Sequence, residues 1–332
     1  MDVFIHQRFD GIYRRHPLVL VDVGARGGLK SNWAPARRHL RLLGFEPDHR
    51  EFSRLMDRAR SSGGSDKYFN TALHNRPGPI TLHVARDGGL SSIFRPNRDF
   101  LDTFPEADRF DTVDVRQVEA DTLDNVLAAD GVTDVDFVKA DTQGSELHVL
   151  QGGSNVLAAS VIGVEAEVEF APIYSDQPLF ADVDAFLRSL GYLLFGLRPC
   201  YWKRASGRAV GGPRGQMIWA DALYLRSIPH LQRSIATLEP AAQASKLLRA
   251  ISVSLLYGYF DYALEIARQS GDVIDPEDRA MIEAQLREAG GHQGPLARFP
   301  GRRRLAIASH WLWKVLVQRD DAWSVSDAKL GN

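Results

Sequence analysis

Two apolar segments near the start of the chain each end in an acidic residue, and the first runs directly into a glycine-rich turn. Residues 18–28 read LVLVDVGARGG, which predicts a buried strand that ends at Asp22 and a turn that begins at Gly24. Residues 41–48 read RLLGFEPD, which predicts a second strand that ends at Glu46. Because doubly wound parallel sheets bind cofactors at the carboxyl ends of their strands, the two acids predict a cofactor site.

The glycine turn differs from the turn that binds a pyrophosphate. Dinucleotide sites use Gly-x-Gly-x-x-Gly, but Ala25 and Arg26 take the place of the middle glycine here. An acid ahead of the first glycine suits a ligand with an amino group, such as S-adenosylmethionine (SAM), and Glu46 stands where an acid accepts both ribose hydroxyls. We therefore expect SAM rather than NAD, with Ala25, Gly27 and Pro47 also in its binding site. A strand-to-helix turn without a ligand is the alternative.

The segment of residues 134–153, DVDFVKADTQGSELHVLQGG, is followed at residues 161–170 by VIGVEAEVEF. Together they resemble the signature of the FkbM-type SAM-dependent methyltransferases, Asp-x-x-Gly-x-Glu-x-x-x-Leu-x-Gly. The resemblance covers roughly residues 17–226, and Thr142-Gln143 departs from it, since many relatives carry Val or Ile followed by Glu or Gln. In this chain the core residues are Asp141, Gly144, Glu146, Leu150 and Gly152.

The resemblance implies a class I methyltransferase, an α/β fold with a doubly wound, mostly parallel sheet of seven strands. The methionine part of SAM would then lie at Asp22 and Gly24, and the ribose at Glu46. Ala72, in an expected third strand over residues 68–73, would lie near the adenine. Relatives methylate sugar or polyketide hydroxyls, so the resemblance implies an O-methyltransferase.

Carboxylates and a histidine stand at the ends of the later strands, where the acceptor hydroxyl would be activated. Methyl transfer to a hydroxyl needs a base, or a metal that stabilises the forming alkoxide. Asp141 ends the expected fourth strand, Glu146 opens the helix after it, and Glu165 lies in the expected fifth strand. We expect these three residues to be catalytic and on the acceptor side, with Asp141 also near the cofactor. His74, at the end of the third strand, is the alternative base.

The expected fifth strand carries an unusual amount of charge for a buried element. Glu165, Glu167 and Glu169 have the two-residue spacing that places side chains on one face of a strand. Asp141 and Glu165 would suit a divalent cation such as Mg²⁺, whose preferred ligands are carboxylate oxygens. Structural ion pairing of Glu165 is the alternative. A further acid, Asp221, lies in the last hairpin, where it faces the acceptor or forms a salt bridge at the edge.

The composition is that of a soluble globular protein, with 44% hydrophobic and 25% charged residues among 332. A net charge of −2 gives no argument for a nucleic-acid partner. Cys200 is the single cysteine, which excludes an intrachain disulfide and a cysteine-rich zinc site. Because the start of the chain lacks a signal-peptide core and no apolar run reaches about 18 residues, we expect a cytoplasmic protein without a transmembrane segment.

Strand and helix patterns alternate up to residue 227 and then give way to helix alone. We therefore expect a methyltransferase domain over residues 1–227 and a helical extension over residues 228–332. Within the first unit, a helix is expected from about Trp33 to Leu43. Residues 87–110 are rich in Gly, Pro and charge and long for a connection, which is typical of a lid or binding loop, or of a surface excursion.

The extension has two segments that could make contacts. Residues 245–271 and the following helix look like a hairpin of the tetratricopeptide kind, which we interpret as an appendage docked on the domain rather than a peptide-binding module. Residues 299–320 place three arginines before an apolar stretch with two tryptophans. Such a tail could contact a membrane interface, as would suit work on a lipid-linked glycan. Because it is apolar nearly all round, we expect it buried against the protein or in a homodimer.

These features favour a SAM-dependent O-methyltransferase whose acceptor is a hydroxyl, most simply that of a sugar in a glycan or glycosylated metabolite. A polyketide hydroxyl is the alternative acceptor. A nucleotide-binding oxidoreductase competes with this interpretation, but the glycine spacing disfavours it. A non-catalytic scaffold that binds a partner through its helical C-terminus is the third hypothesis.

Overall fold

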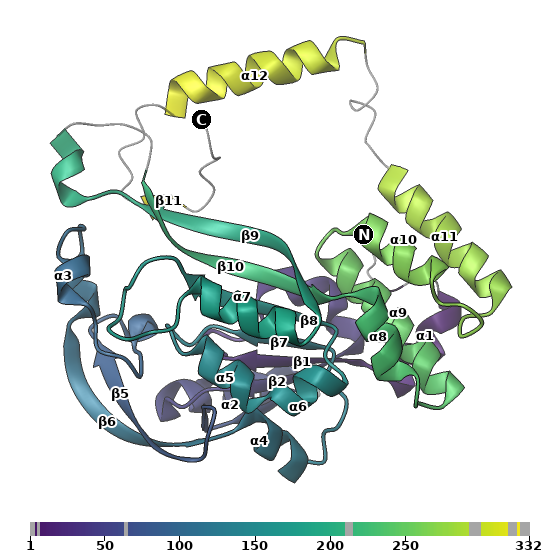
Figure 1. The fold of residues 1–332 in the computed structure, drawn as a ribbon, viewed down its shortest axis with the longest axis horizontal. Coiled ribbons are helices and arrows are strands. Elements are labelled where there is room, and N and C mark those ends of the chain that lie inside the picture. Colours follow the sequence, from purple (N-terminus) through teal and green to yellow (C-terminus); the bar gives the residue numbers. More distant parts are fainter. Residues whose placement is uncertain are drawn as a thin grey trace.

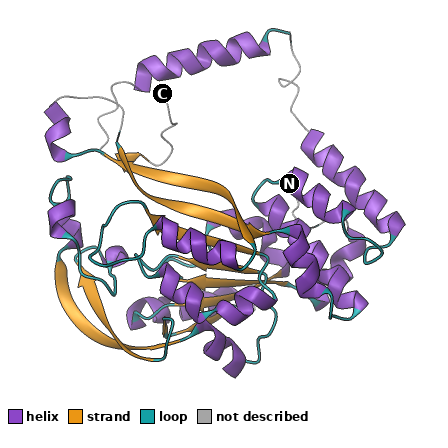
Figure 2. Ribbon diagram, in the orientation of Figure 1, coloured by secondary structure: helices purple, strands orange, loops and turns teal. Residues whose placement is uncertain are grey.

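A sheet of mostly parallel strands forms the centre of the fold, and helices cover both of its faces (Figures 1 and 2). This computed structural model describes residues 4, 7–62, 66–209, 215–291, 300–317 and 324–325. The strands of the central sheet lie in the order β11-β9-β10-β8-β7-β1-β2-β3. Their bounds are β1 (Leu18–Val23), β2 (Leu40–Phe45), β3 (Lys67–Phe69), β7 (Phe137–Ala140), β8 (Gly163–Glu169), β9 (Tyr192–Trp202), β10 (Gln216–Arg226) and β11 (Ser324–Val325).

The order of the seven longer strands is the one expected for a class I methyltransferase. Neighbouring strands pair in parallel from β3 to β8, whereas β10 pairs antiparallel with both β8 and β9. From β1 the chain adds β2 and β3 on one side, and β7 and β8 are added on the other. Parallel sheets that reverse their order in this way open a crevice at the carboxyl ends of the strands on either side of the switch, here β1 and β7.

A second, three-stranded sheet stands beside the first and changes the expected third strand. Its order is β4-β6-β5, with β4 (Ala72–Leu73), β5 (Gly78–Ala85) and β6 (Thr112–Asp121). The expected single strand over residues 68–73 is therefore two short strands in different sheets. The chain bends between them at Asn70, whose side-chain amide donates to the backbone oxygens of Glu46 at 2.9 Å and Pro47 at 3.1 Å.

Helices pack on both faces of the central sheet. One face is covered by α1, the 3₁₀ helix η2, α2 and the C-terminal helices α8 to α10, and the other by α4 to α7. The helix bounds are α1 (Asp10–Arg15), η2 (Ser31–His39), α2 (His49–Ser62), α3 (Arg98–Leu101), α4 (Leu123–Ala129), α5 (Glu146–Gly152), α6 (Ser154–Ala159), α7 (Phe180–Ser189), α8 (Ile228–Ile235), α9 (Pro240–Leu256), α10 (Phe260–Arg268), α11 (Pro276–Gly291) and α12 (Arg302–Val317), with short 3₁₀ turns at η1 (Gln7–Phe9), η3 (Gly88–Leu90), η4 (Ala107–Phe110) and η5 (Ala205–Ala209).

The expected helix from Trp33 to Leu43 was wrong in type and in extent. The chain forms the 3₁₀ helix η2 and enters β2 at Leu40. Pro35 lies inside η2, where its missing N–H and fixed φ disfavour regular α-helical pairing. Leu40, Leu42 and Leu43 are buried, so this apolar run belongs to the sheet core rather than to a helix face.

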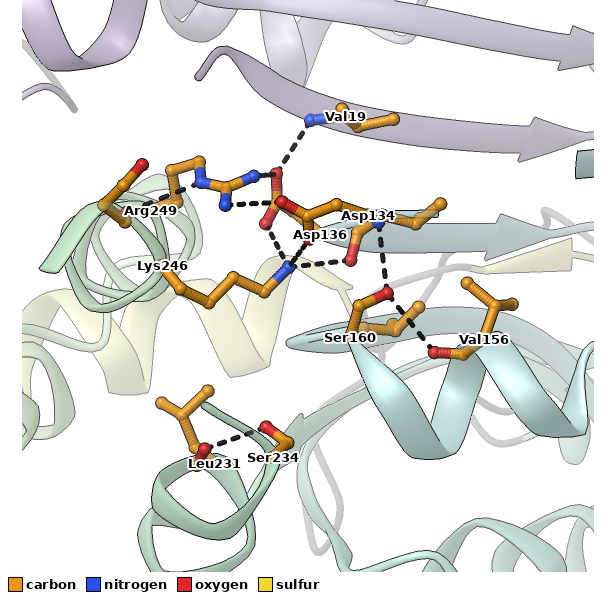
Figure 3. A network of polar contacts seen from close by, with 12 residues as sticks. Val19, Asp134, Asp136, Val156, Ser160, Leu231, Ser234, Lys246 and Arg249 are labelled. Atoms are coloured by element: carbon orange, nitrogen blue, oxygen red, sulfur yellow. Dashed lines mark hydrogen bonds and ion pairs between the residues drawn. The ribbon is translucent and has the colours of Figure 1, made fainter. Parts of the chain in front are cut away.

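Helix α9 is part of the core, because it is buried along most of its length and ion-paired to the central sheet (Figure 3). Lys246 lies 2.5 Å from Asp134 and 2.7 Å from Asp136, in the segment that leads into β7. Arg249 lies 2.7 Å and 2.8 Å from the same two carboxylates. The second oxygen of Asp136 also accepts the backbone N–H of Val19, at 2.9 Å. The boundary at residue 227 stays a prediction, but α9 is docked as closely as any core helix.

The described side chains of helix α12 are not buried against the described part of the chain, contrary to one of the two expectations for the tail, and burial in a homodimer stays a prediction. Every side chain that is described in it is exposed, and Figure 1 shows it apart from the other helices. Residues 299 and 318–320 of that tail lie outside the described part of the chain. Among the described residues no helix is long and apolar enough to cross a membrane.

Candidate active site

A cleft of about 540 Å³ opens at the carboxyl ends of β1, β2 and β7, where the strand order reverses. We call it the cofactor cleft. Its walls come from the turn after β1, the end of β2, the second sheet and the loop after β7. Of the residues expected around a cofactor, Asp22, Gly24, Glu46, Pro47, Ala72 and Asp141 line it.

The turn after β1 is fastened to the ends of both neighbouring strands. The backbone amides of Gly24 and Ala25 both donate to the carbonyl oxygen of Phe45, at 3.1 Å each. Gly24 has a φ of +74°, and a Cβ at this position would collide with the backbone carbonyl of Asp141. Only glycine brings the turn this close to the end of β7.

Ala25 and Gly27 do not line the cofactor cleft, contrary to expectation. Ala25 is buried in the core, and the backbone amide of Gly27 donates to Glu51 at 3.2 Å. The turn changes direction here because Gly27 and Gly28 both have positive φ. Arg26 and Gly28 line the cleft instead.

A buried ion pair joins the ends of β1 and β7 beneath the cleft. Asp22 is in register with Lys139, whose Nζ lies 3.1 Å from Oδ1 of Asp22 and 3.6 Å from Oδ2 of Asp141. Burial raises the pKa of Asp22 to about 6, although Lys139 opposes the shift. Burial alone would lower the pKa of Lys139, but the two carboxylates hold it above its ordinary value. Lys139 therefore stays charged while Asp22 titrates just below neutral pH.

Glu46 projects from the end of β2 in a fixed orientation. The backbone N–H of Asp48 donates to its Oε1 at 2.9 Å. Burial raises the pKa of Glu46, and this hydrogen bond opposes the shift. A buried carboxylate at this strand end suits a pair of vicinal hydroxyls such as those of a ribose.

The second sheet gives the cofactor cleft an apolar wall that the sequence did not reveal. Ile80 and Leu82 of β5 and Val118 of β6 line the cleft beside Ala72 and Leu73. Apolar walls of this kind accommodate a flat aromatic ring. They place the expected adenine position between the two sheets.

The loop after β5 borders the cleft, as expected for a binding loop. Gly88, Gly89, Ser91 and Ser92 line it, and the hydroxyl of Ser92 donates to the backbone oxygen of Gln143 at 2.6 Å. The loop after β7 and this segment are therefore held together at the cleft.

His74, the expected alternative base, does not line the cofactor cleft. Its ring stacks on His148 of α5 with 4.7 Å between ring centroids, and it borders a separate cavity with Arg76 and Pro79. Burial and the neighbouring His148 lower the pKa of His74. His74 lies away from the cofactor cleft because it directly follows β4, which belongs to the second sheet. The structure therefore does not support His74 as the base.

Glu146 organises the loop after β7 rather than facing an acceptor. Its carboxylate accepts the backbone N–H of Thr142 at 2.5 Å and that of Gly144 at 3.0 Å. It is buried and does not line the cofactor cleft, and burial raises its pKa to about 7. In this chain the glutamate therefore shapes the loop, and the structure gives no support to its expected catalytic role.

Gln143 connects the loop after β7 to side chains of β8 and of the segment after it. This role was not predicted from the sequence, because Gln143 was treated only as part of a departure from the family pattern. It has a φ of +56°, an uncommon conformation for a residue with a side chain. Its Nε2 donates to Asp141 at 3.2 Å and to Glu167 at 2.7 Å. The hydroxyl of Tyr174 donates to its Oε1 at 3.1 Å. The strained loop thus aims an amide into the cofactor cleft.

A second cleft of about 410 Å³ lies over β8, β9 and β10 and shares Lys30 with the cofactor cleft. Glu165 lies here, and its carboxylate accepts hydrogen bonds from Lys30 at 3.3 Å and from the hydroxyl of Tyr257 at 2.8 Å. Asp221 lies 3.7 Å from Lys30 and accepts a hydrogen bond from Arg198 at 2.9 Å. Tyr257 and Tyr259, from the segment between α9 and α10, complete this second cleft.

Asp141 and Glu165 do not form the expected metal pair. Asp141 is contacted by Lys139 and by the amide of Gln143, and Glu165 by Lys30 and Tyr257. Among the described residues, no group of three or more His, Cys, Asp or Glu side chains could hold a metal ion. Cationic and hydrogen-bond-donating side chains occupy the positions that a divalent cation would need, so the residues do not fit one.

The segment of the chain that forms this site matches a known protein family. Residues 22–194, just over half of the chain, match the family described as Methyltransferase FkbM domain. The chain belongs to the FkbM methyltransferase family. The match begins at Asp22 and includes the cofactor cleft, the loop after β7 and β8.

One curated relative and several solved structures are similar to this methyltransferase. The 2-O-methyltransferase NoeI of Sinorhizobium fredii (strain NBRC 101917 / NGR234) is 26% identical over 185 residues, which are 53% of this chain and 71% of that protein. The methyltransferase FkbM structure from Methylobacillus flagellatus KT has 15% identity and a TM-score of 0.38, and the match covers 63% of this chain and 43% of that one. Magnesium protoporphyrin IX methyltransferase (ChlM) from Synechocystis PCC 6803 with bound SAM has 11% identity and a TM-score of 0.33, covering 66% and 73% of the two chains.

The methyltransferase uses SAM, and the cofactor cleft fits this cofactor. Two buried carboxylates, Asp22 and Glu46, stand at adjacent strand ends, where they would meet the amino group and the ribose. The apolar wall of the second sheet suits the adenine. A nucleotide-dependent oxidoreductase, the competing interpretation of the glycine turn, is therefore wrong.

Proposed function

We propose that this methyltransferase acts on a hydroxyl group of a sugar, which it binds in the second cleft next to SAM. The support is the single side chain shared by the two clefts, Lys30, and the curated relative, which is a 2-O-methyltransferase. SAM supplies the electrophilic methyl group. The chain's own residues must orient the acceptor oxygen toward that methyl group and take up its proton.

The chemistry of the second cleft suits a ligand with several hydroxyls. Glu165 and Asp221 offer carboxylate oxygens, Lys30 and Arg198 offer N–H donors, and Tyr259 offers an aromatic ring. Carboxylates and cationic donors side by side can both accept from and donate to neighbouring hydroxyls. An apolar polyketide surface would offer these groups no further hydrogen-bond partners.

Asp141 is the proposed base. Its side chain lines the cofactor cleft and is 29% exposed, whereas the side chains of Glu165 and Asp221 are 10% exposed. It stands at the end of β7, between Lys139 and Gln143, which hold the carboxylate in place. An accessible, oriented carboxylate is the geometry that proton transfer from a hydroxyl requires.

Methyl-labelled SAM with separate panels of glycosides, oligosaccharides and hydroxylated polyketides would test this function. We expect label in a sugar hydroxyl, and a rate about 100-fold lower in Asp141→Asn, because a positioned base contributes about that factor. The exposed Asp99→Asn is the matched control and should keep the wild-type rate. Label only in a polyketide, or an unchanged rate in Asp141→Asn, would refute the acceptor or the base respectively.

A further inference from the structure

Helix α12 exposes more large apolar side chains to solvent than any other described element. Ten large hydrophobic residues are exposed in the described chain, and five of them lie on this helix. Single exposed apolar residues are common, but a contiguous group marks an interaction surface. The five and their exposed fractions are Leu305 (61%), Ile307 (62%), Trp311 (65%), Leu312 (52%) and Leu316 (68%).

One face of the helix carries three leucines. At 3.6 residues per turn, Leu305, Leu312 and Leu316 fall within about 20° of one direction. Arg303 and Ile307 fall on the opposite face, and Trp311 lies about 120° from Leu305. Unlike the surface helix α2, whose apolar side faces the core, α12 has an apolar face with no described partner in its own chain.

The charge of α12 is opposite in sign to that of the remaining chain. The helix contains Arg302, Arg303, Arg304 and Lys314 and no acidic residue, so its side chains carry +4. Because the whole chain has a net charge of −2, the rest of it carries −6. The helix therefore combines a net positive charge with exposed apolar residues.

The length of α12 suits a surface position. Its 16 residues extend about 24 Å, which is short of the roughly 30 Å hydrocarbon core of a bilayer. Basic residues together with exposed tryptophan and leucine are the composition of helices that lie in the interface plane. Negatively charged headgroups attract each nearby basic side chain.

We propose that α12 docks the enzyme on the surface of a bilayer that contains anionic lipid. The leucine face enters the interface, and the arginines at the start of the helix contact the headgroups. Pairing of α12 with the α12 of a second copy is a poorer alternative, because two helices of charge +4 repel each other. This surface is separate from both clefts, so it is independent of the methyl acceptor.

Co-sedimentation of the full chain with phosphatidylcholine vesicles, with and without phosphatidylglycerol, tests the proposal. We expect sedimentation only with phosphatidylglycerol, and release at high salt because surface charges are then screened. Reversing the three arginines should weaken binding about 100-fold, and removing the apolar residues roughly tenfold or more. The variants are Arg302→Glu/Arg303→Glu/Arg304→Glu, Leu305→Ser/Trp311→Ser/Leu312→Ser, and the control Val113→Ser/Val115→Ser/Leu238→Ser, which removes three exposed apolar residues elsewhere.

The control should bind vesicles like the wild type, and thermal unfolding should show all variants to be folded. No sedimentation with phosphatidylglycerol, or equal sedimentation of the α12 variants, would overturn the proposal. A dimer in analytical ultracentrifugation that the Leu305, Trp311 and Leu312 variant converts to monomer would also overturn it, because a second copy would then cover the face.

Discussion

At the scale of single residues, the cofactor cleft depends on carboxylates whose protonation is set by burial. Asp22 and Lys139 form a buried pair, yet burial still raises the pKa of Asp22 to about 6. An amino group binds to the ionised form of a carboxylate, because only that form accepts hydrogen bonds without also donating one. The state of Asp22 therefore couples SAM binding to pH in the range just below neutrality.

The dissociation constant for SAM should rise as the pH falls from 8 to 5. Above pH 6 Asp22 is ionised, and below it the protonated form loses the charge-assisted hydrogen bond, which costs about tenfold in affinity per pH unit. Asp22→Asn should bind SAM about 10- to 100-fold more weakly at pH 8, with a much smaller slope. Calorimetry across this range measures both, with Asp99→Asn as the control. An equal slope in Asp22→Asn would remove Asp22 from the amino-group site.

At the scale of elements, the sequence predicted the strands that are buried along nearly their whole length and missed β6, which is exposed. β1, β2, β7 and β8 were predicted because each is buried on both faces. β6 was missed because most of its residues are exposed, so no alternation marks it. The second cleft was also missed, because Lys30 and Tyr257 meet only in the folded chain.

The turn after β1 offers a matched pair of glycine substitutions. Gly24 and Gly27 both have positive φ, but only at Gly24 would a Cβ collide with the backbone of β7's end, while at Gly27 nothing lies within 4 Å. Gly27→Ala should lose about 1–2 kcal/mol of stability from backbone strain alone and still bind SAM. Gly24→Ala should also displace Asp141 and abolish SAM binding. Urea unfolding measures the stability of the two variants, and calorimetry measures their affinity for SAM. Equal losses in both variants would contradict the close contact between the turn after β1 and the end of β7.

At the scale of the whole molecule, helices α8 to α10 pack into the core, and the segment between α9 and α10 completes the second cleft. α9 brings two cations onto Asp134 and Asp136, and the segment after it supplies Tyr257 to Glu165. The sequence predicted that this helical hairpin docks on the domain, but it did not reveal which surface the hairpin covers. Basic residues that stand among the apolar residues of a helix, as Lys246 and Arg249 do in α9, are a signal that the helix belongs to the core and pairs with buried carboxylates.

The two aspartates at α9 should differ in their contribution to stability. The side chain of Asp136 is 0% exposed and that of Asp134 is 48% exposed, although both contact Lys246 and Arg249. Asp136→Asn should lower the free energy of unfolding by about 3–5 kcal/mol, because it removes the fully buried one of the two carboxylates that pair with the buried cations. Asp134→Asn should cost about 1 kcal/mol. Urea unfolding at pH 7 measures both, and similar losses would mean that α9 is held by apolar packing instead.

The most direct measurement is calorimetric titration of the purified protein with SAM and, separately, with NAD. We predict one SAM site, no heat with NAD, and an affinity about 100-fold lower in Glu46→Ala, since the ribose loses hydrogen bonds to a charged group. The exposed Glu119→Ala is the control and should bind like the wild type. Binding of SAM that is insensitive to Glu46→Ala would contradict the cofactor cleft described for this methyltransferase, and silence with SAM would contradict its use of the cofactor.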